Sequence, residues 1–65
     1  MLRFAHNGLP FKAVMGFYRA GPYIVYRVHG GWRALRNDVV LGDYPRFALA
    51  SAACETDAVI QEGVA

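Results

Sequence analysis

Residues that could carry chemistry are few in this chain of 65 residues. The metal-ligand candidates, His6, His29 and Cys54, are scattered and show none of the paired spacings that zinc sites use. A structural zinc site needs four ligands from the protein, and a catalytic one needs three. The sequence therefore predicts neither a metal site nor a bound cofactor.

A nucleophile is equally hard to assign. Cys54 stands in an alanine-rich stretch, where a buried cysteine acts as a small hydrophobic residue, and Glu55 beside it raises the pKa of its thiol. Ser51 has no histidine or aspartate at a spacing that indicates a catalytic triad. Residues 16–22 have the two-glycine outline of a phosphate-binding loop, yet Pro22 stands where that loop needs lysine. We therefore expect no catalytic residues and a protein that is not an enzyme.

Composition predicts one small folded domain over residues 1–65. Hydrophobic residues make up 55% of the chain and charged residues 18%, the reverse of the balance that keeps a chain disordered. A chain of this length buries only about 60% of the surface that it exposes when unfolded, so a deep, well-supported cleft is hard to build. A binding surface is therefore a better expectation than a substrate cavity.

The predicted location is a reducing cytoplasm. Cys54 is the lone cysteine and cannot form an intramolecular disulfide. The first residues lack the apolar run of a signal peptide. Arginines interrupt every stretch that could span a membrane: Arg19, Arg27, Arg33 and Arg36. We therefore expect no membrane contact.

Charge is segregated along the chain. Residues 1–37 hold six cations and no acid, whereas residues 38–65 hold Arg46 and five acids, so the net charge of +2 combines a basic half with an acidic half. In the folded chain the halves either neutralise each other or leave a basic patch for a partner. The aromatic residues all precede residue 48, which indicates that the basic half forms the sheet.

Strand formers and turn residues predict an antiparallel meander within about residues 11–41. Strands are expected at 11–18, with a bulge at Gly16, at 23–29, at 32–36 and at 39–41. A helix follows over about residues 44–62, with Asp43 as its N-cap. Its apolar stripe contains Phe47, Ala50, Cys54 and Ala58, widened by Leu49, Ala52, Ala53, Val59 and Ile60. The expected fold class is α+β: a small three- to four-stranded antiparallel sheet followed by one C-terminal helix packed on one face.

The hairpin around Gly30 and Gly31 decides which side chains of the sheet are buried. A two-residue loop at these glycines scatters apolar and basic residues over both faces. A three-residue loop over residues 29–31 is the preferred alternative, because it gathers apolar residues on one face. That face holds Ile24, Tyr26, Val28, Trp32 and Ala34. The other face holds Val25, Arg27, Arg33 and Leu35, with Val40 beside Leu35 on the next strand.

This second face is uncovered if the helix packs on the first. Val25, Leu35 and Val40 form its apolar centre and Arg27 and Arg33 its basic margin, a composition typical of a contact surface between proteins. Three occupants remain open: residues 1–17 folded back over it, a second copy of the chain in a homodimer, or a foreign protein.

Part of the chain resembles small accessory proteins encoded by phages and prophages. The likeness covers about residues 23–58 and rests on Trp32 in a short meander, the step Leu41-Gly42-Asp43-Tyr44, and the alanine-rich helix after it. Such proteins include inhibitors of host defence, among them anti-CRISPR proteins, which act without catalysis by occupying a surface of a nucleoprotein effector. The resemblance implies an inhibitor from a mobile element that acts in the cytoplasm of a bacterial host and blocks a host protein or nucleoprotein complex. It carries over no functional residue.

The alternation of arginine and aromatic residues supports an alternative, a small basic nucleic-acid-binding protein. Its contacts would come from Arg19, Arg27, Arg33 and Arg36. The aromatic motif of an RNA-recognition strand is absent, and in the preferred register Tyr26 and Trp32 point away from the arginines. Binding to a protein is therefore the leading hypothesis and binding to nucleic acid the less favoured one.

Overall fold

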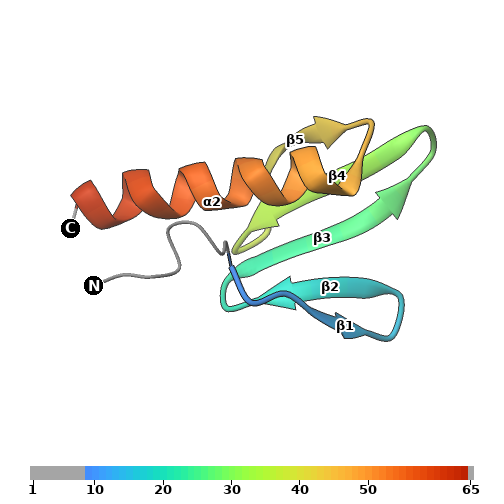
Figure 1. Ribbon diagram of the computed structural model, residues 1–65, viewed down its shortest axis with the longest axis horizontal. Helices are drawn as coiled ribbons and strands as arrows, with labels where there is room; N and C mark the ends of the chain where they lie inside the picture. The colour runs from blue at the N-terminus through green and yellow to red at the C-terminus, as the bar shows by residue number, and fades with distance from the viewer. Residues whose placement is uncertain (1–8, 65) are drawn as a thin grey trace.

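The computed structural model describes residues 9–64 and arranges them as a sheet followed by a helix. The strands are β1 (Lys12–Val14), β2 (Phe17–Ala20), β3 (Tyr23–Val28), β4 (Gly31–Arg36) and β5 (Val39–Tyr44), and the helix is α2 (Phe47–Val64). The strands pair antiparallel in chain order, so the sheet is a five-stranded meander (Figure 1). The predicted α+β fold is confirmed, with five strands in place of three or four.

Turn residues explain the extra strand. The stretch predicted as one strand over residues 11–18 divides at Gly16, whose φ of 91° lies in the left-handed region that glycine tolerates, and β1 and β2 pair as a hairpin. Between β4 and β5, Asn37 and Asp38 adopt φ angles of 47° and 70°, the pair of left-handed residues that joins two twisted strands tightly. This second turn lies where the sequence predicts it, but β5 continues to Tyr44 instead of ending at Leu41.

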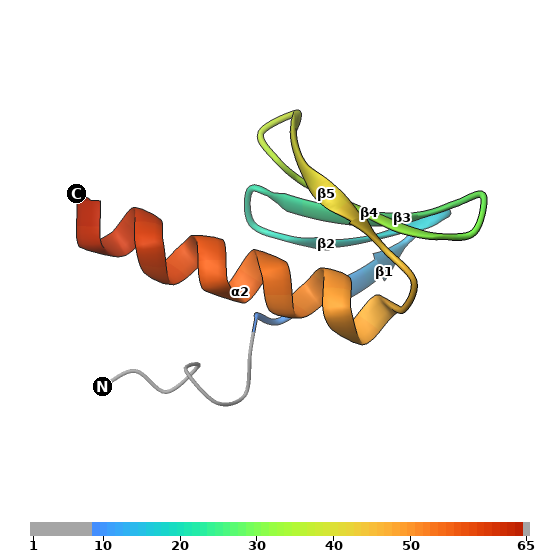
Figure 2. The ribbon, with the colours of Figure 1, turned by 90° about the horizontal axis from the view of Figure 1, so that it is seen from above.

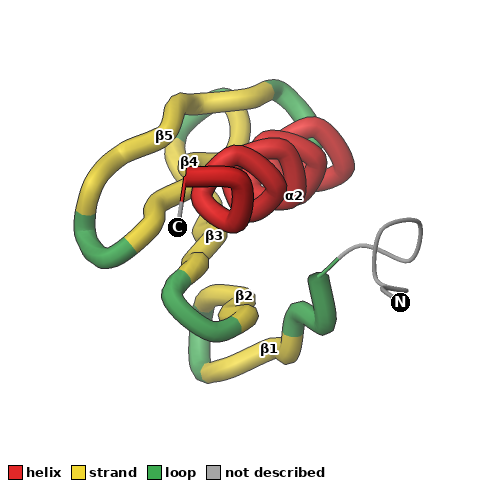
Figure 3. Tube along the Cα trace, turned by 90° about the vertical axis from the view of Figure 1, so that its left-hand side faces the viewer, coloured by secondary structure: helices red, strands yellow, loops and turns green. Residues whose placement is uncertain are grey.

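The helix lies on one face of the sheet, against β3, β4 and β5. Figure 2 shows α2 on that side only, and Figure 3, which looks along the helix, shows the strands curving past it. Ala50 and Cys54 lie on the side of α2 that faces the sheet and are fully buried, in one core cluster with Tyr23, Val25 and Ala34 of the sheet. The small side chains of Ala50 and Cys54 let the helix approach the strands closely. Phe47 and Ala58 also pack against this core, so the predicted core stripe is confirmed.

The predicted widening of that stripe is wrong for its larger residues. Leu49, Val59 and Ile60 are 47%, 59% and 55% exposed. The reason is geometric: the C-terminal turns of α2 extend beyond the sheet (Figures 1 and 2), and the sheet covers only one side of the helix. Within residues 9–64 no helix has the length and apolarity needed to cross a lipid bilayer.

The register of β3 on β4 differs from both predicted alternatives. The turn consists of His29 and Gly30, with Gly30 at a φ of 85°, so that Arg27 pairs with Trp32 and Val25 with Ala34. Gly31 belongs to β4 and is buried, and the backbone carbonyl of Tyr44 in β5 approaches it so closely that a Cβ at this position would collide with it. One glycine of the pair makes the turn, and the other lets two strands approach.

The start of the helix also differs from the prediction. Asp43 does not cap α2, because it lies within β5, and the helix begins at Phe47. The carbonyl of Arg46 accepts the first hydrogen bonds, from the backbone N–H groups of Leu49 and Ala50 at 3.1 and 3.2 Å. Asp43 is thereby free to pair with a residue on the neighbouring strand.

Candidate functional site

The register divides the predicted partner-binding residues between the two faces of the sheet. Arg19, Arg33, Leu35 and Val40 lie on the face opposite α2, the last three as predicted. Val25 and Arg27 were predicted on that face and lie instead on the side of the helix. Val25 has no exposed surface and belongs to the core, so it cannot contact a partner. The correction follows directly from the shift of the β3–β4 turn to residues 29 and 30.

Arg36 is engaged within the molecule. Its Nη1 donates to both carboxylate oxygens of Asp57 on α2 at 2.7 Å, and the Tyr23 hydroxyl donates to the same carboxylate at 2.8 Å. These hydrogen bonds, led by that of Arg36, hold the pKa of Asp57 below its usual value. Because the charge of Arg36 is neutralised at the sheet–helix junction, this residue is poorly placed for phosphate contacts.

We call the apolar surface opposite α2 the open face. It consists of Phe17 of β2, Ile24, Tyr26 and Val28 of β3, Leu35 of β4 and Val40 of β5. Ile24 pairs with Leu35 and Leu35 with Val40, so an apolar ladder crosses three strands. Val40 is 54% exposed and the other members of the open face are half-buried. Within residues 9–64 no element covers this surface (Figure 2).

The charged groups around the open face are only partly those predicted. Arg33 binds Asp43 on the next strand through two hydrogen bonds of 2.7 and 2.9 Å, and this pairing holds the pKa of Asp43 below its usual value. The pair is neutral overall, so Arg33 adds little basic charge. Lys12 and Arg19, which pair across β1 and β2, supply the cations instead. The basic margin therefore lies along the β1–β2 edge.

The described part of the N-terminal segment does not cover the open face. Leu9 and Phe11 pack on the helix side, where the Phe11 ring meets Phe47 at a centroid distance of 5.9 Å. Residues 12–14 form the edge strand β1, and Met15 in the turn after it is 93% exposed. The alternative in which residues 1–17 fold back over this face is thus excluded for residues 9–17, and residues 1–8 lie outside the described residues.

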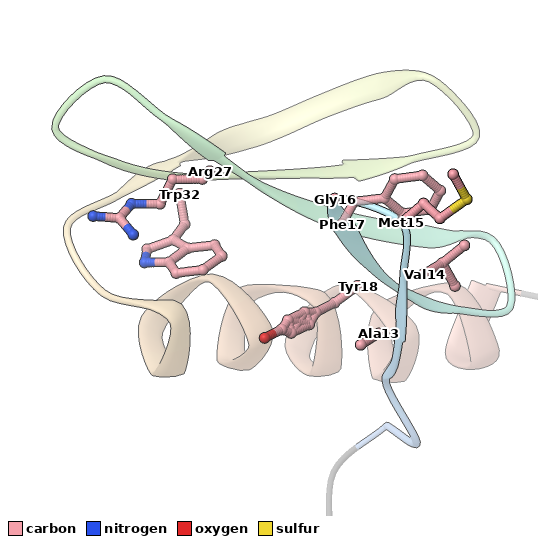
Figure 4. A pocket seen from close by; sticks show the side chains of 8 residues that line it. All are labelled: Ala13, Val14, Met15, Gly16, Phe17, Tyr18, Arg27 and Trp32. Carbon is pink, nitrogen blue, oxygen red and sulfur yellow. The ribbon is translucent and has the colours of Figure 1, made fainter.

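A second feature lies at the end of the sheet where β1 turns into β2. The guanidinium carbon of Arg27 lies 5.1 Å from the centre of the Trp32 ring, and both side chains border a pocket of about 310 Å³ (Figure 4). We call it the Arg27 pocket. Its other lining residues are Ala13, Val14, Met15, Gly16, Phe17 and Tyr18. Tyr18 and Trp32 both pack against Phe47, at centroid distances of 4.8 and 5.3 Å, so the aromatic wall is held in place by the helix.

The candidate nucleophile is placed where it cannot react readily. Cys54 is fully buried, and burial, together with the charges of Asp57 and Glu55, raises the pKa of its thiol to about 11. In the described part of the chain, no three His, Cys, Asp or Glu side chains come together as metal ligands. His6 lies outside that part. What the arrangement offers chemically is apolar contact, hydrogen bonding and charge.

Comparisons with known proteins leave the family open. Neither protein-family models, nor curated proteins, nor solved structures give a significant match.

The sequence-based prediction missed four residues of the open face: Phe17 of β2 and, on β3, Ile24, Tyr26 and Val28. The alternation of the last three along β3 was visible, but it assigns a face only once the turn is fixed. A turn at His29-Gly30 was the signal that could have found them, since it pairs Tyr26 with Arg33 and not with Ala34.

Proposed function

We propose that this chain is a non-enzymatic binding protein that docks on a larger host protein or nucleoprotein complex through its open face and blocks it. The apolar ladder Ile24–Leu35–Val40 is the observation that supports the proposal. A contiguous apolar surface bordered by polar groups is typical of contact surfaces between proteins. In a chain this small, these side chains would stabilise the core better if an element covered them.

The charges around the ladder fit a protein partner. Arg33 and Asp43 form an ion pair that is neutral overall and holds both side chains in fixed positions. Lys12 and Arg19 add positive charge at one edge. Such a margin steers a partner with an acidic surface and fixes its orientation more than it adds affinity. The inhibitory role and the origin in a mobile element rest on the resemblance of residues 23–58 to phage-encoded proteins.

Binding to nucleic acid is the weaker alternative. Arg33 and Arg36, two of the four arginines on which it depends, form ion pairs with Asp43 and Asp57. A protein that contacts several phosphates loses orders of magnitude in affinity between about 50 and 200 mM salt. Titration of a labelled single-stranded oligonucleotide at both salt concentrations separates the two proposals.

The direct test compares two double variants in capture from a bacterial lysate. Leu35→Glu with Val40→Glu charges the open face, and Leu49→Glu with Ile60→Glu charges exposed positions of α2 as a matched control. A captured protein is identified by mass spectrometry and its binding is then measured with purified components. We expect the unmodified chain and the helix variant to bind alike, and the open-face variant to bind at least about tenfold more weakly.

Circular dichroism and the state of association complete the test. A folded open-face variant that retains full affinity for the purified partner contradicts the proposal. If the unmodified chain is a dimer by light scattering and only the open-face variant is a monomer, the second copy is the occupant of this face and the proposed foreign partner is wrong.

A further inference from the structure

We infer that the Arg27 pocket is a second binding site, which takes an aromatic side chain next to an Asp or Glu residue on a partner protein. This site lies at the end of the sheet near the β1–β2 turn and shares Phe17 with the open face, but neither Leu35 nor Val40 lines it, so the inference does not rest on the proposed function. Three features of the pocket point to this ligand: a cation that forms no ion pair within residues 9–64, an aromatic wall and a small volume.

The cation is available to a ligand. Arg27 is exposed, and within residues 9–64 its guanidinium makes no ion pair. Residues 1–8 contain no acidic residue that could supply one. By contrast, Arg33 and Arg36 each hold an aspartate. Arg27 is thus a cation beside a pocket with no carboxylate of the described chain to neutralise it.

The cation–π contact of Arg27 with Trp32 prepares the guanidinium for a planar anion. A guanidinium that lies over an indole keeps its N–H groups at the edge, where they match the two oxygens of a carboxylate. The pairing of Arg27 with Trp32 across β3 and β4 fixes both residues on rigid strands.

Most of the other side chains that line the pocket are apolar or aromatic, and its size suits one side chain. Ala13, Val14 and Met15 form one border, with Phe17 and Tyr18 beside them (Figure 4). A volume of about 310 Å³ is at the small end of the range for ligand sites, which suits an aromatic side chain better than a folded surface. A nucleic acid would need several cations along its backbone, and the lining holds Arg27 alone.

The sole tryptophan of the chain makes the site easy to observe. The indole N–H resonance of Trp32 is followed by NMR while the peptide acetyl-Gly-Phe-Glu-Gly-amide is added to the full chain. We expect saturable shifts at Trp32 and Arg27 with a Kd of about 0.1–1 mM. The matched peptide with Gln in place of Glu should bind at least about tenfold more weakly, because it lacks the carboxylate.

Variants test whether Arg27 is the residue that binds the carboxylate of the peptide. Arg27→Gln should raise the Kd for the Glu peptide at least about tenfold, Arg27→Lys should raise it less, and Arg19→Gln should leave it unchanged. The open-face variant Leu35→Glu with Val40→Glu should still bind the peptide, which separates this inference from the proposed function. The amide spectrum of each variant reports whether it is folded.

Three results would overturn the inference. The first is equal binding of the Glu and Gln peptides, and the second is the absence of saturation at about 5 mM peptide. The third is tighter binding at the same resonances by a short oligothymidine or by a peptide that ends in phenylalanine with a free carboxylate. Tighter binding of either ligand would show that the pocket takes that ligand and not an aromatic side chain next to an Asp or Glu residue.

Discussion

The hydroxyl of Tyr23 donates a 2.8 Å hydrogen bond to the carboxylate of Asp57, thirty-four residues later in the chain. Tyr23 and Arg36 are paired across β3 and β4, and both reach the same carboxylate on α2. Asp57 therefore joins two strands to the helix at one point. This junction ties α2 to the face of the sheet that carries Tyr23 and Arg36, and within residues 9–64 the opposite face is uncovered.

Removing the hydroxyl should weaken that junction. Tyr23→Phe leaves the ring in place and deletes a hydrogen bond to a charged group, so we expect the free energy of unfolding to fall by about 1–2 kcal/mol. Urea unfolding followed by Trp32 fluorescence measures it. Tyr18→Phe is the control, because its hydroxyl makes no hydrogen bond with described residues, and should change stability by less than about 0.5 kcal/mol. Equal losses in the two variants would contradict the role of Asp57.

Stability should depend on pH at the acid end through Asp57. Arg36 holds the folded-state pKa of Asp57 below its unfolded value, so the carboxylate contributes stability above about pH 4, and this contribution is lost as pH falls through the folded pKa. Asp57→Asn should be less stable at pH 7 and should lose less on acidification. Urea midpoints between pH 7 and the acid limit test this; parallel profiles for the two proteins would refute it.

At alkaline pH the dependence has the opposite sign, and stability falls as pH rises. Burial, with the hydrogen bond to Asp57, raises the pKa of Tyr23 from 10.0 to about 12, and burial raises that of Cys54 from 9.0 to about 11. The folded protein therefore holds protons that the unfolded chain releases, and stability should decline as pH rises from about 9 to 12. Tyr23→Phe combined with Cys54→Ala should flatten this decline, as urea midpoints at increasing pH would show.

The thiol of Cys54 should be unreactive while the chain is folded. Because it is fully buried and protonated at neutral pH, its reaction with a disulfide reagent at pH 8 should be at least about tenfold slower than in urea. Absorbance of the released thiolate measures both rates. Equal rates in the two conditions would show that Cys54 is accessible and would reopen its assignment as a core residue.

Gly31 should tolerate no side chain. In Gly31→Ala the new Cβ meets the backbone carbonyl of Tyr44, which cannot move without displacing β5, so we expect a loss of about 1–3 kcal/mol. Gly63→Ala is the matched control, because open space surrounds that position and alanine favours a helix. It should be neutral or slightly stabilising. A Gly31→Ala protein as stable as the unmodified chain would contradict the β4–β5 packing.

The fold was predictable because its signals are local. Strand formers between turn residues predict the meander, and the spacing of Phe47, Ala50, Cys54 and Ala58 predicts the helix and its buried stripe. These patterns depend only on residues that are neighbours along the chain. The Asn37-Asp38 turn was predictable for the same reason.

The open face was only half predictable because it depends on the register of one hairpin. Gly30 and Gly31 are both glycines, but they have different roles. Gly30 supplies a left-handed turn position, whereas Gly31 leaves room for the Tyr44 carbonyl of the neighbouring strand β5. No local pattern separates these roles. A shift of one residue moves Val25 into the core and Tyr26 to the surface. The partners of Asp43 and Asp57 were hidden for the same reason, since both pairings depend on register and packing.

Side-chain footprinting by hydroxyl radicals, with and without the captured partner, tests the docking surface most directly. The open-face side chains Tyr26, Leu35 and Val40 should lose reactivity when the partner binds, while Leu49, Val59 and Ile60 on α2 keep theirs. Protection of the three helix residues together with unchanged reactivity at Tyr26, Leu35 and Val40 would place the contact on the other side of the molecule and contradict the account.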